Sequence, residues 1–256
     1  MQRYFIQLSY DGSAYHGWQI QPNGISVQET VEKALSVVAR QSVAVTGAGR
    51  TDAGVHASFY VAHFDSDNLN LDSEKIIHNL NCLLPADIAV QVLLKVNPEA
   101  HARFDATSRT YKYYLAKTKD PFSRQYAAKE SRVPDLAKMN EAASRLFDYE
   151  DFTSFSRLGT DVKTNNCKVD VARWIDEGNR IVFTIRADRF LRNMVRAIVG
   201  TLLEVGFGKI TIEEFCKIID AKDRCAAGAS VPAKGLFLVD IGYPETLSSG
   251  LIRSQN

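Results

Sequence analysis

Hydrophobic and polar residues alternate with two different periods along this chain, and the order of the periods predicts its elements. In the first half the pattern predicts a β-α-β-β-α-β order. The predicted strands lie at about 2–10, 42–47, 56–64 and 88–96, and the predicted helices at about 27–40 and 73–82. Ser26, with Glu29 three residues later, is a capping-box pattern at the start of the first helix.

The second half repeats this order. Strands are predicted at about 109–117, 168–176, 180–187 and 235–242, and helices at about 135–147, 190–204 and 211–220. Two such units are typical of duplicated ferredoxin-like folds and of RNA-binding RRM domains. We therefore predict an α+β protein of two ferredoxin-like (RRM-like) halves, joined into one mainly antiparallel sheet with a central cleft. The expected division is 1–105, 106–245 and a frayed tail at 246–256.

Composition narrows the class of protein. The 256 residues are 45% hydrophobic and 24% charged, which is ordinary for a globular protein with a sizeable core. No apolar stretch reaches the roughly 18 residues of a membrane span, and the start lacks a signal-peptide layout. We expect a cytoplasmic protein without a membrane partner. The four cysteines form no CxxC pair and the five histidines no HxxxH, so we expect neither a zinc site nor a disulfide framework.

Charge is spread unevenly, although the net charge is only +1. Residues 1–100 carry a balance of −4, and residues 101–132 a balance of +5. A local basic stretch of this kind favours a nucleic-acid partner, but it also describes an ordinary solvated surface.

The string GAGRTDAGVHA at 47–57 lies between two predicted strands. It is not a dinucleotide fingerprint, because Asp52 stands where the third glycine would be, and it is not a P-loop, because Val55 and His56 follow the last glycine. What remains is a glycine-framed loop that presents Arg50 and Asp52. By spacing alone, an aspartate here is as readily a turn cap as a reacting group, and His56 is expected to be structural.

Two further segments carry candidate chemistry. The helix predicted from Phe190 has an apolar stripe, and Arg192 and Arg196 are four residues apart on it and therefore expected on one face. A half-buried Arg196 would need an anion, although a solvated arginine with a packed stem fits equally. Strand alternation places Tyr111 and Tyr113 on one face of the strand at 109–117, a pattern that suits either base stacking or core packing.

Together with matches spread over most of the chain, these stretches resemble the tRNA pseudouridine synthase A family, in its compact bacterial form. The matching strings are YDG at 10–12, YHGWQIQP at 15–22, SVQE at 26–29, GAGRTDAGVHA at 47–57, HARFDATSRTYKY at 101–113, DFTSF at 151–155, FLRNMVRAIVG at 190–200 and PAKGL at 232–236. The sequence departs from the family at Ala100, where phenylalanine is common.

The resemblance implies a role for each matching residue. Asp52 corresponds to the family's catalytic aspartate and Arg196 to the arginine that pairs with it. Tyr111 matches the active-site tyrosine, Arg50 the arginine that helps to flip out the target base, and Leu236 the leucine that lines the uracil pocket.

The resemblance also implies the pseudouridine-synthase fold and a homodimer that acts, without cofactor or metal, on uridines 38, 39 and 40 of tRNA. Such an enzyme detaches uracil from the sugar, rotates it and rejoins it through carbon, after the base has flipped out of its stack. Asp52 would act as a nucleophile at the sugar or at the base, or would assist removal of a sugar proton; the resemblance leaves these routes open.

Two other functions compete with this one. A non-catalytic RNA-binding module of two RRM-like halves would carry an RNP1 pattern, but the strand HASFYVAHF lacks its Lys/Arg-Gly opening. A nucleotide-dependent enzyme is disfavoured by the failed phosphate loops.

Overall fold

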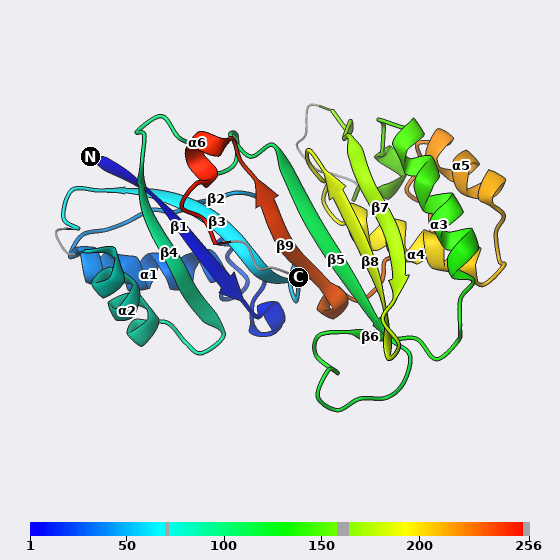
Figure 1. Ribbon diagram of the computed structural model, residues 1–256, viewed down its shortest axis with the longest axis horizontal. Helices are drawn as coiled ribbons and strands as arrows, with labels where there is room; N and C mark the ends of the chain where they lie inside the picture. Colours follow the sequence, from blue (N-terminus) through cyan, green and yellow to red (C-terminus); the bar gives the residue numbers. More distant parts are fainter. Residues whose placement is uncertain (70–71, 158–163, 253–256) are drawn as a thin grey trace. The chain divides into compact units, whose positions relative to one another are not determined.

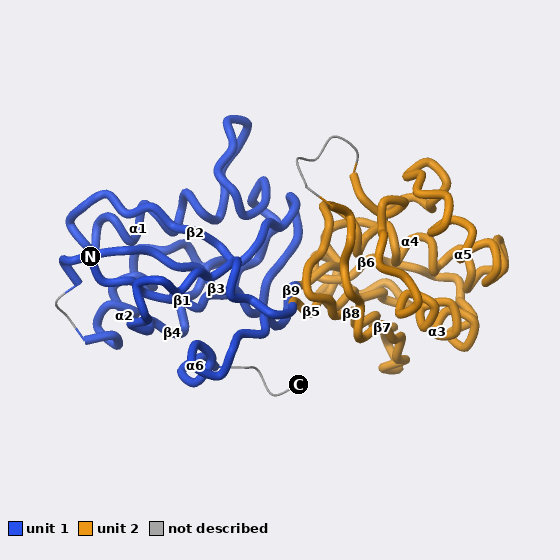
Figure 2. Tube along the Cα trace, turned by 90° about the horizontal axis from the view of Figure 1, so that it is seen from above, with its two compact units in different colours: residues 1–108, 238–256 blue, residues 109–237 orange. Residues whose placement is uncertain are grey.

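A computed structural model describes residues 1–69, 72–157 and 164–252, and the chain divides into two compact units. The first unit comprises Met1–Ser108 with Leu238–Asn256, and the second Arg109–Phe237, as coloured in Figure 2. The expected division at 1–105, 106–245 and 246–256 stays a prediction; residues 253–256 of the expected tail lie outside the described residues.

The first unit follows the predicted β-α-β-β-α-β order. Its elements are β1 (Gln2–Tyr10), α1 (Val27–Ala39), β2 (Thr46–Gly47), β3 (His56–Ser66), α2 (Ser73–Leu83) and β4 (Ile88–Val96). Strands run in the order β4-β1-β3, with β2 paired to the far side of β3 in antiparallel fashion (Figure 1). β9 (Leu236–Gly242) begins at the last residues of the second unit and continues in the first.

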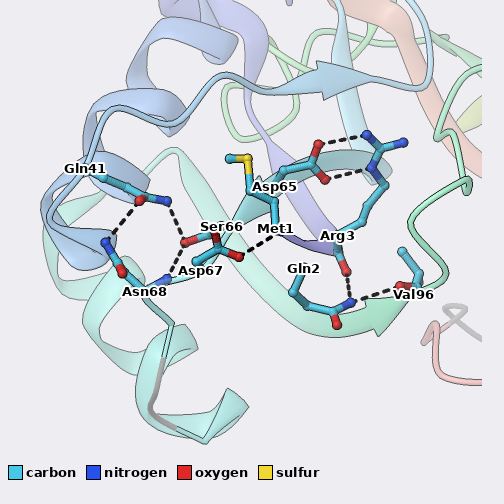
Figure 3. Close-up of polar contacts among 9 residues, drawn as sticks. All are labelled: Met1, Gln2, Arg3, Gln41, Asp65, Ser66, Asp67, Asn68 and Val96. Carbon is cyan, nitrogen blue, oxygen red and sulfur yellow. Dashed lines mark hydrogen bonds and ion pairs between the residues drawn. The ribbon is translucent and has the colours of Figure 1, made fainter.

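Polar contacts join the start of β1 to the end of β3, and the end of β3 to the segment after α1. Arg3 on β1 lies opposite Asp65 on β3 and donates two hydrogen bonds of 2.8 Å to its carboxylate (Figure 3). The Ser66 hydroxyl accepts from Gln41 at 2.9 Å, which ties the segment after α1 to the end of β3. The largest fully buried side chains of the unit are Tyr60, Phe5, Phe59, Phe64, Ile6, Leu8 and Leu35.

The second unit repeats the arrangement. Its elements are β5 (Ser108–Ala116), β6 (Ala128–Lys129), α3 (Leu136–Ser144), β7 (Val169–Asp176), β8 (Arg180–Ala187), α4 (Met194–Gly206) and α5 (Ile212–Asp220), with short 3-10 turns at 145–148, 153–155 and 233–235. The strand order is β5-β8-β7. With the two-residue β6 set aside, the first three strands of this unit therefore lie in the order first, third, second, as β1-β3-β2 do in the first unit. Helices α3, α4 and α5 pack on one another, and α3 packs against β7.

The strand predicted at 42–47 is mostly wrong, because only Thr46–Gly47 pairs in the sheet. The backbone N–H groups of Val43 and Val45 instead donate to side chains of α1, Ser36 Oγ at 3.0 Å and Glu32 Oε1 at 2.8 Å. The alternation of hydrophobic and polar residues at 42–45 therefore reflects packing beside a helix and not pairing in a β-sheet.

The helix predicted at about 190–204 begins later, at Met194. Asn193 precedes it with φ of 67°, in the left-handed region, which breaks the helical path between Arg192 and the rest of the helix. Arg192 and Arg196 thus do not share a helical face, and that prediction is wrong.

The expected frayed tail is wrong for residues 246–252. α6 (Glu245–Ser248) is followed by a reciprocal pair of hydrogen bonds between Gln7 and the backbone of Ile252, at 2.7 and 2.8 Å. Gln7 is only 3% exposed, so the tail covers a polar side chain of the sheet.

The α+β class with mainly antiparallel strands is confirmed. Across the described part of the chain, no helix has both the length and the apolar character that crossing a membrane requires.

Candidate active site

The glycine-framed loop at 47–57 joins β2 to β3, and its backbone is tied down along its length. Ala48 N donates to Val61 O at 2.9 Å, and the Tyr60 hydroxyl donates to Gly49 O. The Thr51 hydroxyl lies 2.9 Å from the Tyr10 hydroxyl. The residue before Asp52 is thereby fixed to the body of the unit.

Gly17, in the matching string at 15–22, packs directly against this loop. Its φ is +93°, and a Cβ placed on it would lie 2.3 Å from Thr51 O. The backbone N–H of the next residue, Trp18, donates to the same Thr51 carbonyl at 3.2 Å. Only glycine permits both this backbone conformation and this close approach.

Aromatic rings support the same contact. Trp18 and Tyr60 stack with centroids 4.1 Å apart, and Tyr10 meets Tyr60 edge-on at 5.6 Å. A Cβ on Gly47 would lie 2.2 Å from the Tyr60 hydroxyl oxygen, so the loop starts flush against this cluster. The loop therefore packs on a cluster of three buried aromatic rings.

The end of the loop is closed by its own backbone. Val55 N donates to the Asp52 carbonyl at 3.1 Å, and Gly54, with φ of 75°, follows Asp52 by two residues. The turn that follows Asp52 is thus closed by a backbone hydrogen bond to the Asp52 carbonyl. Its side chain is half-buried, and that of Arg50 is exposed.

His56 has the contacts of a structural histidine. It is 1% exposed, and its Nδ1 lies 3.1 Å from Gly12 N and 3.0 Å from Asp11 Oδ1. A Cβ on Gly12 would lie 2.0 Å from Val55 O, so the 3-10 turn at 12–14 seals this side of the loop.

In the second unit, Tyr111 lies on β5 opposite Ile185 of β8 and is 9% exposed. Its ring meets Phe190 edge-on, with centroids 5.2 Å apart at 90°. Tyr113, two residues along, is fully buried and donates to Pro232 O at 2.9 Å. Burial raises the pKa of the Tyr113 phenol. The burial pattern confirms that both tyrosines face the same side of the strand.

Arg196 is half-buried on the first turn of α4. Its Nε donates to Val231 O at 2.8 Å, and Val231 N donates back to Arg196 O at 3.2 Å. One turn later a Cβ on Gly200 would lie 1.9 Å from Ala229 O, so the helix and this segment are in close contact. The guanidinium is therefore oriented by a backbone carbonyl that side-chain patterns cannot reveal.

Leu236 is 5% exposed and starts β9, directly after the 3-10 turn at 233–235. A Cβ on Gly235 would lie 2.8 Å from the Tyr113 ring. The segment 229–236 therefore contacts Arg196 and the side of β5 that carries the two tyrosines, and it ends in Leu236.

Arg50 and Asp52 belong to the first unit, whereas Tyr111, Arg196 and Leu236 belong to the second. The Asp52–Arg196 ion pair stays a prediction. Over residues 1–69, 72–157 and 164–252, no group of three or more His, Cys, Asp or Glu side chains has the arrangement of a metal site.

Comparison with known proteins identifies relatives over nearly the whole chain. A sequence model described as tRNA pseudouridine synthase matches residues 7–105 and 142–244. A tRNA pseudouridine synthase A of Bacteroides fragilis is 60% identical over 248 residues, 96% of this chain and 98% of the relative. Proteins of the same name from Parabacteroides distasonis and Bacteroides thetaiotaomicron are 60% and 61% identical, over 96% and 97% of this chain and 98% and 93% of theirs.

Proposed function

Because the chain belongs to the tRNA pseudouridine synthase family, we propose that it converts uridine to pseudouridine in tRNA, at positions 38, 39 and 40 of the anticodon stem-loop. The observation that supports this most directly is the GRTDAGVH loop, whose backbone is held by Gly17, Trp18 and Tyr60 so that it presents Asp52.

The reaction is an isomerisation. The C1′–N1 bond between sugar and uracil breaks, the detached uracil turns, and a bond forms between C1′ and C5 while the C5 proton passes to N1 through solvent or a side chain. Nothing is gained or lost, so no energy donor or redox group is required. The detached base must remain in place while it turns, which requires a closed pocket that excludes water.

In our proposal Asp52 provides the reacting carboxylate, as a nucleophile at the sugar or the base or as the base that removes a sugar proton. Arg196 would pair with it and keep it ionised, because a nearby cation opposes the effect of burial on a carboxyl pKa. Its fixed bond to Val231 O supports this role, since the guanidinium then needs little reorganisation.

The remaining residues would hold the base and the RNA. Tyr111 would stack on the uracil, and its edge contact with Phe190 supports this role by fixing the ring plane. Leu236 would line the pocket with an apolar side chain. Arg50, exposed beside Asp52, would take the space left in the stem when the uridine flips out.

We further propose that the working unit is a cytoplasmic homodimer, in which one tRNA contacts both protomers. A tRNA presents charge over a longer span than one 28.5 kDa chain, and a second protomer would extend its contact surface. Light scattering at assay concentrations should give about twice the chain mass. An active monomer would refute the dimer while leaving the catalytic proposal intact.

The experiment that tests the proposed function is incubation of the purified protein with unmodified tRNA transcripts that carry uridine at 38, 39 or 40, followed by position-resolved mapping of pseudouridine. Pseudouridine should form at these positions and be absent from transcripts with cytidine there. Binding of tRNA without product would instead favour the RNA-binding module, and product elsewhere would contradict the assigned positions.

A further inference from the structure

A loop of residues 117–127 extends beyond the end of β5 in the second unit (Figure 1). Its far end is anchored by β6, which pairs with β5 in parallel through Leu115 and Ala128. Glu130 N then donates to Ala116 O at 3.0 Å. We refer to residues 117–127 as the projecting loop.

Internal contacts fix the shape of the projecting loop. Phe122 N donates to Asp120 Oδ1 at 2.9 Å, and Tyr126 N donates to Ser123 O at 2.9 Å. The Lys234 ammonium donates to the Arg124 carbonyl at 2.9 Å, and the Tyr126 ring lies 6.2 Å from that of Phe237. The tip is therefore presented in a defined conformation.

Phe122 at the tip is 91% exposed, more than any other phenylalanine among the described residues. Single apolar side chains on a surface are common and need no partner. What distinguishes this ring is the charge around it.

Three exposed cations lie on or against the loop: Lys119, Arg124 and Lys234. None of them has a carboxylate partner among the described residues, whereas Lys117 at the base pairs with Asp176, Nζ to Oδ2, at 2.5 Å. The loop's one acidic residue, Asp120, caps its turn. The tip thus combines an open aromatic ring with an excess of positive charge, three cations against the one carboxylate of Asp120.

We propose that the projecting loop is a second tRNA contact, distinct from the reacting uridine: Phe122 stacks on an unpaired nucleobase, and Lys119, Arg124 and Lys234 bind phosphates beside it. Every base offers a flat face to a ring, and phosphates are attracted by cations whatever the base, so the contact would add affinity without reading sequence. A purely protein partner would use the ring but leave three cations to be neutralised. This inference rests on the proposed function, because tRNA is the substrate there.

The test compares Phe122→Ala, Phe122→Leu and Phe122→Trp in the full-length protein, with an unmodified tRNA transcript. Replacement by alanine or leucine should raise the tRNA Kd about tenfold, the usual effect of losing one base–aromatic stack, while tryptophan retains affinity. The single-turnover rate at saturating tRNA should stay unchanged. Phe147→Leu, at another exposed ring of the second unit, is the matched control and should leave Kd unchanged.

Salt dependence tests the cations separately. Lys119→Gln should reduce the slope of log Kd against log salt by about one phosphate contact. A wild-type Kd in Phe122→Ala would overturn the inference, as would a Phe122→Ala protein that sediments as a smaller species, since the ring would then bind a second copy of the chain. Failure of the wild-type protein to form pseudouridine would instead contradict the proposed function.

Discussion

At the scale of single residues, Gly17 decides where Asp52 sits. A side chain there would collide with Thr51 O and would also have to adopt a φ of +93°. Gly17→Ala should therefore lower the free energy of unfolding by about 1–3 kcal/mol and reduce turnover, because the loop that carries Asp52 must shift.

Gly49 provides the control, because it stands in the same motif and a Cβ on it would meet nothing within 4 Å. Gly49→Ala should unfold like the wild-type protein. Thermal unfolding of both variants checks the pair, and equal stabilities would contradict the assigned packing of Gly17.

His63 is a second residue with a measurable consequence. It is 6% exposed, its Nδ1 accepts from Ala102 N at 3.1 Å, and burial, with His101 and Arg3 nearby, lowers its pKa to about 4. Asp65 and Asp105 oppose that shift more weakly. An unfolded histidine has a pKa of about 6.5, so between these values the unfolded state binds the extra proton.

The contribution of His63 to the free energy of unfolding is therefore fully present above pH 6.5 and is lost as the pH falls towards 4. The loss should amount to about 2 kcal/mol, allowing for solvent that reaches the ring. His63→Gln should remove this part of the pH dependence, as measured by urea unfolding at pH 4.5 and 7.5. Parallel pH profiles for the two proteins would exclude His63 as its source.

Some site residues were predictable and others were not. The resemblance marks Asp52, because its motif is a specific string of side chains. Val231 was missed, because the group that orients Arg196 is a backbone carbonyl, which any residue carries. Tyr60 was missed because an aromatic residue in a strand signals core packing as readily as support of a loop.

At the scale of elements, periodicity was sufficient wherever an element packs one face and exposes the other. It predicted β1, β4 and β8 almost to the residue. It was wrong at 42–45, where the backbone donors are taken by Ser36 and Glu32 of α1. Period-2 alternation reports which residues are buried, and a chain lying along a helix shows it as well.

The predicted start of α4 was wrong for a related reason. The apolar stripe extends back to Leu191, which is buried, although Asn193 has already left the helical region. Buried residues continue before the first residue of α4, so the hydrophobic pattern also continues there. Asparagine tolerates this left-handed conformation better than most residues, which is the one local signal that marked the break.

The C-terminal segment gives a prediction at this scale. Gln7 uses both its amide oxygen and nitrogen to hold Ile252. Gln7→Leu keeps the volume but removes both bonds, so the segment should detach at a cost of about 1–2 kcal/mol. Hydrogen exchange of the Ile252 amide should accelerate, whereas Gln91→Leu, at an exposed glutamine that bonds Ser9, should leave it unchanged. Unaltered protection would show that apolar contacts alone hold the tail.

At the scale of the whole molecule, the proposed reaction requires Arg196 of the second unit to pair with Asp52 of the first. Arg196→Met should lower the single-turnover rate about a hundredfold while tRNA affinity changes little, because the charge acts mainly in the transition state. Arg192→Met, exposed just before the helix, should instead raise Kd and leave the rate alone. Similar effects of both changes on Kd alone would make Arg196 an RNA-binding residue.

The proposed function depends above all on Asp52 as the reacting carboxylate, so loss of this carboxylate is its sharpest test. Asp52→Asn is assayed by single turnover on an unmodified tRNA transcript, with tRNA affinity measured in parallel and Asp72→Asn as control, because asparagine caps α2 as well as aspartate does. We predict that Asp52→Asn binds tRNA with near wild-type affinity and forms no detectable pseudouridine, while Asp72→Asn is fully active. Pseudouridine formation by folded Asp52→Asn at a rate near that of the wild-type protein would show that Asp52 does not carry the reaction.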